Sequence, residues 1–143
     1  MKRSILVEAD GGPLAVVVAG ANVADAQLLE ETIEAVVLER PPVEEGWPQH
    51  LCLDKAYDDE AGWGACVDHE HEPHIAVIRH ERPAGSQRHE PRRRVVERTL
   101  AWLSKCRAIL VRWDKKAENY LGLLKLACIL LWFRRYHRLI WRP

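Results

Sequence analysis

A glycine-rich turn near the N-terminus constrains the fold of this chain more than any other part of its sequence. The segment 10–13 (Asp-Gly-Gly-Pro) separates two runs rich in β-branched residues, 4–9 and 14–19. Glycine adopts the positive φ angles that tight hairpin turns need, so this pattern predicts an antiparallel β-hairpin. Any fold for the chain must therefore accommodate antiparallel strands at its start.

The pattern that follows the hairpin alternates between helical and strand signals. Apolar residues at helical spacing predict a helix that is capped at Asn22 and Asp25, includes Val37 and is stopped by residues 40–42 (Arg-Pro-Pro). Such a pattern belongs to layered α/β domains, in which ligands bind beyond the carboxyl ends of strands. Further along we expect strands at 50–54 and 74–78, a weaker helix at 58–68, a basic loop at 79–91, and two helices at about 92–110 and 115–138.

The distribution of charge is strongly uneven, although the net charge is zero. Residues 1–74 hold 4 of the 21 Lys and Arg residues and 16 of the 21 Asp and Glu residues, which leaves 17 and 5 for residues 75–143. A basic half of this strength favours a polyanionic partner. The alternative is that the two halves match each other's charge within the molecule.

The cysteines and the apolar segments indicate in which cellular compartment the protein is expected. The cysteines are widely spaced and form no CxxC pair, and the N-terminus does not resemble a signal peptide, so we expect free thiols and a reducing, cytoplasmic location. The most apolar segment, 121–133, is 13 residues long and contains Lys125. It is too short to span a bilayer, so it predicts a buried helix and no membrane partner.

Two carboxylates are candidates for chemistry. Glu97 lies one helical turn from Arg93 and Arg94, which suits a metal-binding acid beside a phosphate track; the alternative is a surface carboxylate paired with arginines. Asp54 ends an apolar strand, and the alternative for it is a helix cap or a turn acid. Together they predict a pair of Mg²⁺ ligands, because hard divalent ions prefer carboxylate oxygens and water.

Four groups of residues stand out as motifs along the chain. They are residues 12–14 with 20–25, residues 53–58 (Leu-Asp-Lys-Ala-Tyr-Asp), residues 95–99 with 102–103, and residues 112–121. Taken in order, they resemble successive landmarks of bacterial insertion-sequence transposases of the DDE superfamily. The resemblance covers nearly the whole chain, and its last two landmarks are specific motifs. It implies a ribonuclease-H-like core in which a triad of Asp, Asp and Glu holds two Mg²⁺ ions.

The resemblance assigns roles to the two carboxylates. Asp54 matches the second Asp of the triad, and Glu97 matches its Glu. The family's first Asp lies on a strand that precedes the point where this chain begins. We therefore expect residues 1–143 to form a truncated ribonuclease-H-like α/β fold that lacks its first strand, ends in two helices and has no upstream DNA-binding region. Ala56 stands where the family usually has Gly, which adds strain if that position needs a positive φ.

The resemblance also implies DNA as the partner, both as element ends and as target, and a nucleoid-associated protein. Basic residues along the last two helices are expected to contact phosphates. The alternative for them is to balance the acidic half of the chain. These residues are Arg92, Arg93, Arg94, Arg98, Lys105, Lys115 and Lys116.

Three hypotheses for function follow. The leading one is a fragment of a transposase that cleaves and rejoins phosphodiesters, inactive alone and dependent on an upstream transposase segment or a full-length transposase. The second is a non-catalytic DNA-binding or inhibitory partner of a full-length transposase. The third is a small zinc-binding module formed by Cys66, His69, His71 and His74. Without its first strand, the isolated chain is expected to be poorly soluble or marginally stable.

Overall fold

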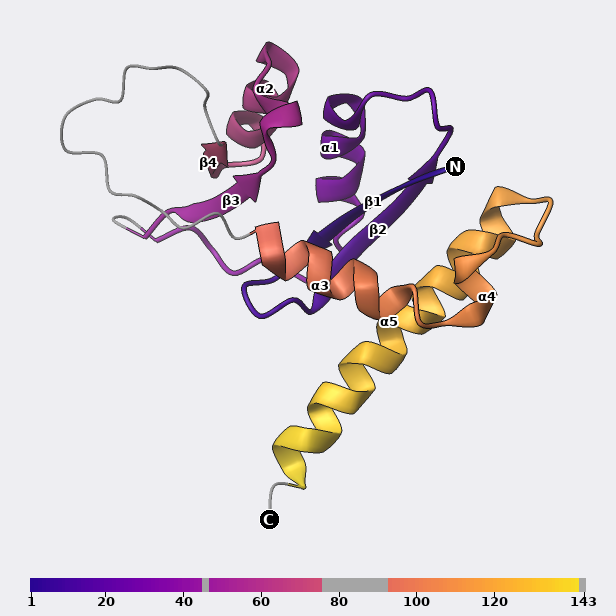
Figure 1. Ribbon diagram of the computed structural model, residues 1–143. Helices are drawn as coiled ribbons and strands as arrows, with labels where there is room; N and C mark the ends of the chain where they lie inside the picture. The colour runs from indigo at the N-terminus through magenta and orange to yellow at the C-terminus, as the bar shows by residue number, and fades with distance from the viewer. Residues whose placement is uncertain (45–46, 76–92, 142–143) are drawn as a thin grey trace.

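The computed structural model describes residues 1–44, 47–75 and 93–141, arranged as small β-sheets with covering helices (Figure 1). The predicted basic loop at 79–91, residue Arg92 and the second half of the predicted strand at 74–78 lie outside the described residues. The elements are β1 (Lys2–Val7), β2 (Pro13–Ala19), α1 (Asp25–Glu34), β3 (Gln49–Leu53), the 3₁₀ helix η1 (Lys55–Tyr57), α2 (Glu60–Asp68), β4 (His71–Ile75), α3 (Arg93–Leu103), α4 (Arg107–Leu110) and α5 (Ala117–Ile140).

The predicted hairpin is confirmed. β1 and β2 pair antiparallel, with Ser4 opposite Val17. Gly11 has a φ of 91° in the connecting turn, a conformation that glycine adopts without steric cost. The carboxylate of Glu8 accepts 2.7 Å hydrogen bonds from the backbone N–H groups of Asp10 and Gly12, which closes the turn.

The hairpin forms the middle of three layers. Neighbouring residues of a strand point to opposite faces, and here Ile5 packs with α5 whereas Leu6 packs with Leu29 and Ile33 of α1. Figure 1 shows α1 on one side of the hairpin and α3 with α5 on the other. Both faces of the hairpin are therefore covered, which explains why β2 is almost continuously apolar.

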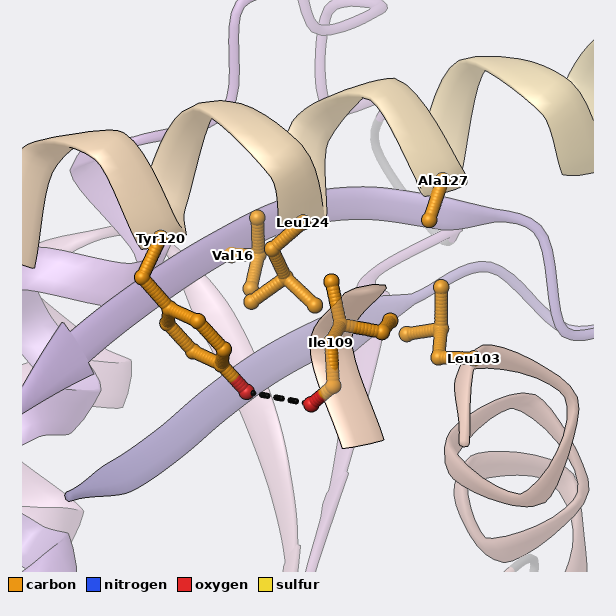
Figure 2. Close-up of a cluster of buried hydrophobic side chains, with 6 residues drawn as sticks. All are labelled: Val16, Leu103, Ile109, Tyr120, Leu124 and Ala127. Atoms are coloured by element: carbon orange, nitrogen blue, oxygen red, sulfur yellow. Dashed lines mark hydrogen bonds between the residues drawn. The ribbon is translucent and has the colours of Figure 1, made fainter. Parts of the chain in front are cut away.

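Figure 2 shows the core between the hairpin and the C-terminal helices. Leu103, Ile109 and Leu124 are 0 to 2% exposed and meet Val16 of β2. Each such leucine or isoleucine contributes roughly 1.5–3 kcal/mol through burial. This cluster joins three helices to the hairpin and holds the C-terminal part of the chain in place.

β3 and β4 form a second sheet, which is parallel. The connection between parallel strands is made here by α2, whose Ala65 and Cys66 pack on Leu51. Among the described residues, β1 pairs only with β2 and β3 only with β4, so each has one edge without a strand partner. The α/β class is thus confirmed, with two separate two-stranded sheets.

The predicted boundaries of α1 are wrong at both ends. Its N-cap is Ala24, because Asn22 lies in a turn closed by the Val23 N–H and the Gly20 carbonyl, 3.2 Å apart. The helix ends at Glu34, and Val37 is 93% exposed. The chain leaves the helix before Arg40, whose guanidinium donates hydrogen bonds to the carbonyls of His69 and Glu70.

The C-terminal helices also differ from the prediction. The expected helix at 92–110 is divided at residues 104–106, where the chain turns so that Ile109 enters the core. The segment 121–133 is not a buried helix, since Phe133 is 62% exposed while Leu124 is fully buried. Among the residues described, no helix combines the length and the apolar character needed to cross a bilayer.

Candidate functional site

Asp54 follows directly on β3, at the carboxyl end of the strand, as predicted. It is also the N-cap of η1, because its Oδ1 accepts a 2.7 Å hydrogen bond from the backbone N–H of Lys55. Asp54 therefore occupies both predicted positions at once, the end of a strand and the cap of a helix. The hydrogen bond fixes the orientation of the carboxylate where β3 ends.

A second acidic residue lies near the same point. Burial raises the pKa of the Tyr57 phenol, and the charges of Asp25 and Asp54 raise it further, while a hydrogen bond with Ser4 lowers it. Asp25 is in the first turn of α1, and its Oδ1 lies 3.1 Å from the Nζ of Lys2. Two carboxylates, those of Asp25 and Asp54, therefore act on the Tyr57 phenol at the end of β3.

Glu97 is on the exposed side of α3. The opposite side of the helix is anchored to the hairpin turn, because the hydroxyl of buried Thr99 donates a 2.6 Å hydrogen bond to the carbonyl of Gly11. Arg98 donates another, also 2.6 Å, to the carbonyl of Asp10. The turn therefore sets the position of α3 and, with it, the position of Glu97.

The two predicted metal ligands come from different elements, the end of β3 and the middle of α3. Among the described residues, two groups of three or more potential ligand atoms lie within 4.8 Å of one another, and neither includes Asp54 or Glu97. Shared coordination by this pair stays a prediction. Ala56 carries no strain of the expected kind, since Glu70 is the single residue other than glycine with a positive φ in the described part of the chain.

The predicted phosphate-binding residues differ in their surroundings. Arg94 is exposed one turn before Glu97, whereas Arg98 is engaged with the hairpin turn. Lys105 lies over the ring of Trp102, 5.3 Å from its centroid. Lys115 and Lys116 are exposed just before α5. Arg92 and the side chain of Arg93 lie outside what the structure describes.

The predicted zinc cluster is divided among separate surroundings. Cys66 is 0% exposed in the core, and burial raises the pKa of its thiol. The ligand atoms of His69, Glu30 and Glu34 lie within 4.8 Å of one another. Nε2 of His71 lies 3.4 Å from Nη1 of Arg40. His74 instead meets His50 across the β3–β4 sheet, with a nitrogen–nitrogen distance of 2.6 Å.

Sequence reasoning missed two groupings. Tyr57 belongs to the motif that contains Asp54, but nothing in the spacing indicated that Asp25 would lie near its phenol. The grouping of His50, Glu72 and His74 depends on the parallel register of β3 and β4. Alternation of polar side chains along both strands was the available signal, although the register could not be read from it.

Comparisons with known proteins agree on one family. A family model described as "Transposase DDE domain" matches residues 1–132. Over 141 residues the chain is 35% identical to a Burkholderia cepacia protein whose description is that of a transposase for insertion sequence element IS402. That alignment covers 96% of this chain, which spans 64% of the relative's length. No solved structure gave a significant match.

Proposed function

The chain belongs to the DDE transposase family, and we propose that Asp54 and Glu97 supply two of the acidic residues with which a transposase of this family cleaves and rejoins DNA. The observation that carries this proposal is the position of Asp54. Its carboxylate follows the end of a strand, is oriented by the Lys55 N–H, and acts together with Asp25 on the phenol of Tyr57. Strand ends of this kind are where α/β sheets bind their ligands.

The family generally uses divalent metal ions, and the donor atoms of the two predicted ligands are of the kind that such an ion prefers. Asp54 and Glu97 offer carboxylate oxygens, the ligands that Mg²⁺ prefers, and both side chains are exposed. A bound Mg²⁺ would stabilise charge on the oxygens of the reacting phosphodiester. Asp54 and Glu97 would hold the ion. The hydrogen bonds between α3 and the hairpin turn would keep Glu97 in position to do so.

Basic side chains support DNA as the partner. Arg94 lies one helical turn before Glu97 and is exposed, so it can contact a phosphate next to the carboxylate. Lys115 and Lys116 are exposed at the start of α5, where the helix dipole disfavours cations, so an external anion would relieve that repulsion. Contacts of this kind position DNA without reading its sequence.

The separation of the two sheets supports a ribonuclease-H-like fold that lacks one strand. β1 and β3 each have an edge without a strand partner among the described residues, and an added strand could pair with both. In the proposal this strand carries the remaining Asp of the triad and comes from an upstream transposase segment. The chain alone would then bind DNA and metal without catalysing strand transfer.

The test compares the chain with Asp54→Asn and Glu97→Gln, using Glu118→Gln as a control, because Glu118 is an exposed carboxylate on α5. Mn²⁺ serves as a spectroscopic probe in place of Mg²⁺. We expect each site variant to weaken Mn²⁺ binding by roughly tenfold or more, by analogy with other metal-site changes, and the control to leave it unchanged. Equal Mn²⁺ affinity in all four proteins would overturn the assignment.

A second assay separates catalysis from binding. The chain is incubated with labelled DNA and Mg²⁺, and both retention of the DNA and strand transfer are measured. Salt-sensitive binding without transfer is expected. Transfer by the chain alone, abolished by Glu97→Gln, would contradict its dependence on an added strand. DNA binding combined with no metal binding at all would favour the non-catalytic DNA-binding partner instead.

A further inference from the structure

We propose that His50, Glu72 and His74 form a zinc-binding site on the exposed face of the β3–β4 sheet. The site is separate from the carboxylates of the proposed function. It also differs from the cluster predicted from the sequence, with which it shares only His74. The grouping comes from the pairing of two strands.

The register of the sheet brings the three side chains together. His50 pairs with Glu72, and His74 is two residues further along β4, so all three point to one face. The opposite face carries Leu51, which is buried against α1 and α2. His50 and Glu72 are about half exposed, with side-chain exposures of 49% and 51%. The side chains of His50 and Glu72 can therefore be reached from solvent, and that of His74 is partly buried beside them.

The distances between the ligand atoms are close to those a metal ion requires. Nδ1 of His50 lies 2.6 Å from Nε2 of His74 and 3.4 Å from Oε2 of Glu72, and the ligand atoms all fall within 4.8 Å of one another. Tetrahedral zinc with Zn–N bonds of about 2.0–2.1 Å separates two ligand nitrogens by about 3.3 Å. A small rotation of the exposed imidazoles provides that separation.

The donor set selects zinc over the ions that carboxylates alone attract. Two imidazole nitrogens and one carboxylate oxygen form a set that zinc accepts, with one position left for water. Mg²⁺ and Ca²⁺ favour oxygen ligands throughout, so they compete poorly for this group. The other group of close ligands, formed by Glu30, Glu34 and His69, has a single imidazole and is the weaker zinc site.

Zinc at this position would link β3 to β4. These strands have no other strand neighbours among the described residues, so the ion would add a connection to a two-stranded sheet. It would bind the folded register and not the unfolded chain, and so it would raise the unfolding temperature by mass action. Its effect on stability can thus be measured without any assay of catalysis.

The test is calorimetric titration of the metal-free chain with Zn²⁺, together with its melting temperature with and without Zn²⁺. We expect one Zn²⁺ to bind per chain and to raise the melting temperature. His50→Ala and His74→Ala should weaken binding by more than about 100-fold, since even outer-shell changes cost 10- to 100-fold. His69→Ala is the matched control that should retain binding, because it changes an imidazole that belongs to the other group of close ligands.

Three outcomes would overturn the proposal. The first is the absence of saturable Zn²⁺ binding by the unchanged chain. The second is loss of binding in His69→Ala while His50→Ala retains it, which would place the metal elsewhere. The third concerns Glu72→Gln, which should bind Zn²⁺ more weakly while its circular dichroism spectrum stays unchanged. Zinc affinity unaffected by this change would remove Glu72 from the site.

Discussion

The hydroxyl of Tyr120 donates a 3.0 Å hydrogen bond to the carbonyl oxygen of Ile109 inside the core between the hairpin and α5 (Figure 2). Ile109 belongs to α4, a helix of four residues whose last carbonyls have no partner within the helix. The Tyr120 hydroxyl satisfies one of these carbonyls in a place that water does not reach. A short helix can therefore end in the core at little energetic cost.

Replacing Tyr120 with Phe should lower the free energy of unfolding by about 1–2 kcal/mol, because the buried carbonyl of Ile109 loses its donor. The aromatic ring remains, so the packing around Leu124 should not change. Urea denaturation followed by circular dichroism measures the difference. A change within a few tenths of a kcal/mol would mean that the hydrogen bond adds nothing to stability.

Gly12 and Gly122 form a matched pair for a test of the hairpin's contact with α5. A Cβ at Gly12 would overlap the ring of Trp132, which is held by a 2.7 Å hydrogen bond to the carbonyl of Pro13. We expect Gly12→Ala to destabilise the chain by about 1–3 kcal/mol.

At Gly122, within α5, an added Cβ meets nothing within 4 Å. Gly122→Ala should therefore stabilise the chain, by up to about 1 kcal/mol, because alanine favours the helix. Thermal melts of the two variants should move in opposite directions. Shifts of the same sign would contradict the contact between the hairpin and α5.

The pKa of Glu8 gives the hairpin turn a pH dependence. Burial acts to raise this pKa, but hydrogen bonds from the N–H groups of Asp10 and Gly12 and from Arg135 outweigh it, so the pKa falls below the usual 4.5. A group whose pKa is lowered by folding contributes stability above its unfolded pKa and loses it as the pH falls through the folded value. The contribution should thus be complete at neutral pH and decline below about pH 4.5.

Comparison of the chain with Glu8→Gln checks this. The stability difference between the two proteins, measured by urea unfolding, should be largest near pH 7 and shrink below about pH 4.5. Glu118→Gln, a change to an exposed carboxylate on another element, is the control and should show a smaller pH dependence. If the stability difference between the two proteins instead grew as the pH fell, the lowered pKa of Glu8 in the folded chain would be contradicted.

The exposed apolar residues of α5 should make the isolated chain associate. Ile129 and Phe133 lie one helical turn apart and are 60% and 62% exposed. Surfaces of this kind are typical of contacts between proteins, and open strand edges add to the tendency. In light scattering we expect oligomers that become smaller in the double variant Ile129→Lys/Phe133→Lys. A monodisperse monomer with a cooperative, high-temperature unfolding transition would contradict this expectation.

The features that the sequence predicted correctly are those set by local chemistry. The hairpin was predictable because a glycine with positive φ lies between two strand-forming runs. Asp54 was predictable at a strand end because the apolar run before it stops there. Neither inference required knowledge of which segments meet in space.

The features that were missed depend on contacts between distant segments. The helical pattern of α1 continues past Glu34, where the helix ends, and Arg40 further along binds carbonyls of the turn between α2 and β4. The break between α3 and α4 exists because Ile109 enters the core. His50 and His74 are 24 residues apart in the sequence, and their grouping arises from the register of β3 and β4, which spacing along the chain does not reveal.

The turn of the hairpin is held by helices that are synthesised well after it. Thr99 and Trp132 donate hydrogen bonds to the carbonyls of Gly11 and Pro13 across 88 and 119 residues of sequence. On the ribosome, the turn therefore emerges long before its partners, and contacts of such separation form slowly. The turn can be secured only after α5 has emerged, so a nascent chain arrested before α5 should remain open to proteases at the hairpin.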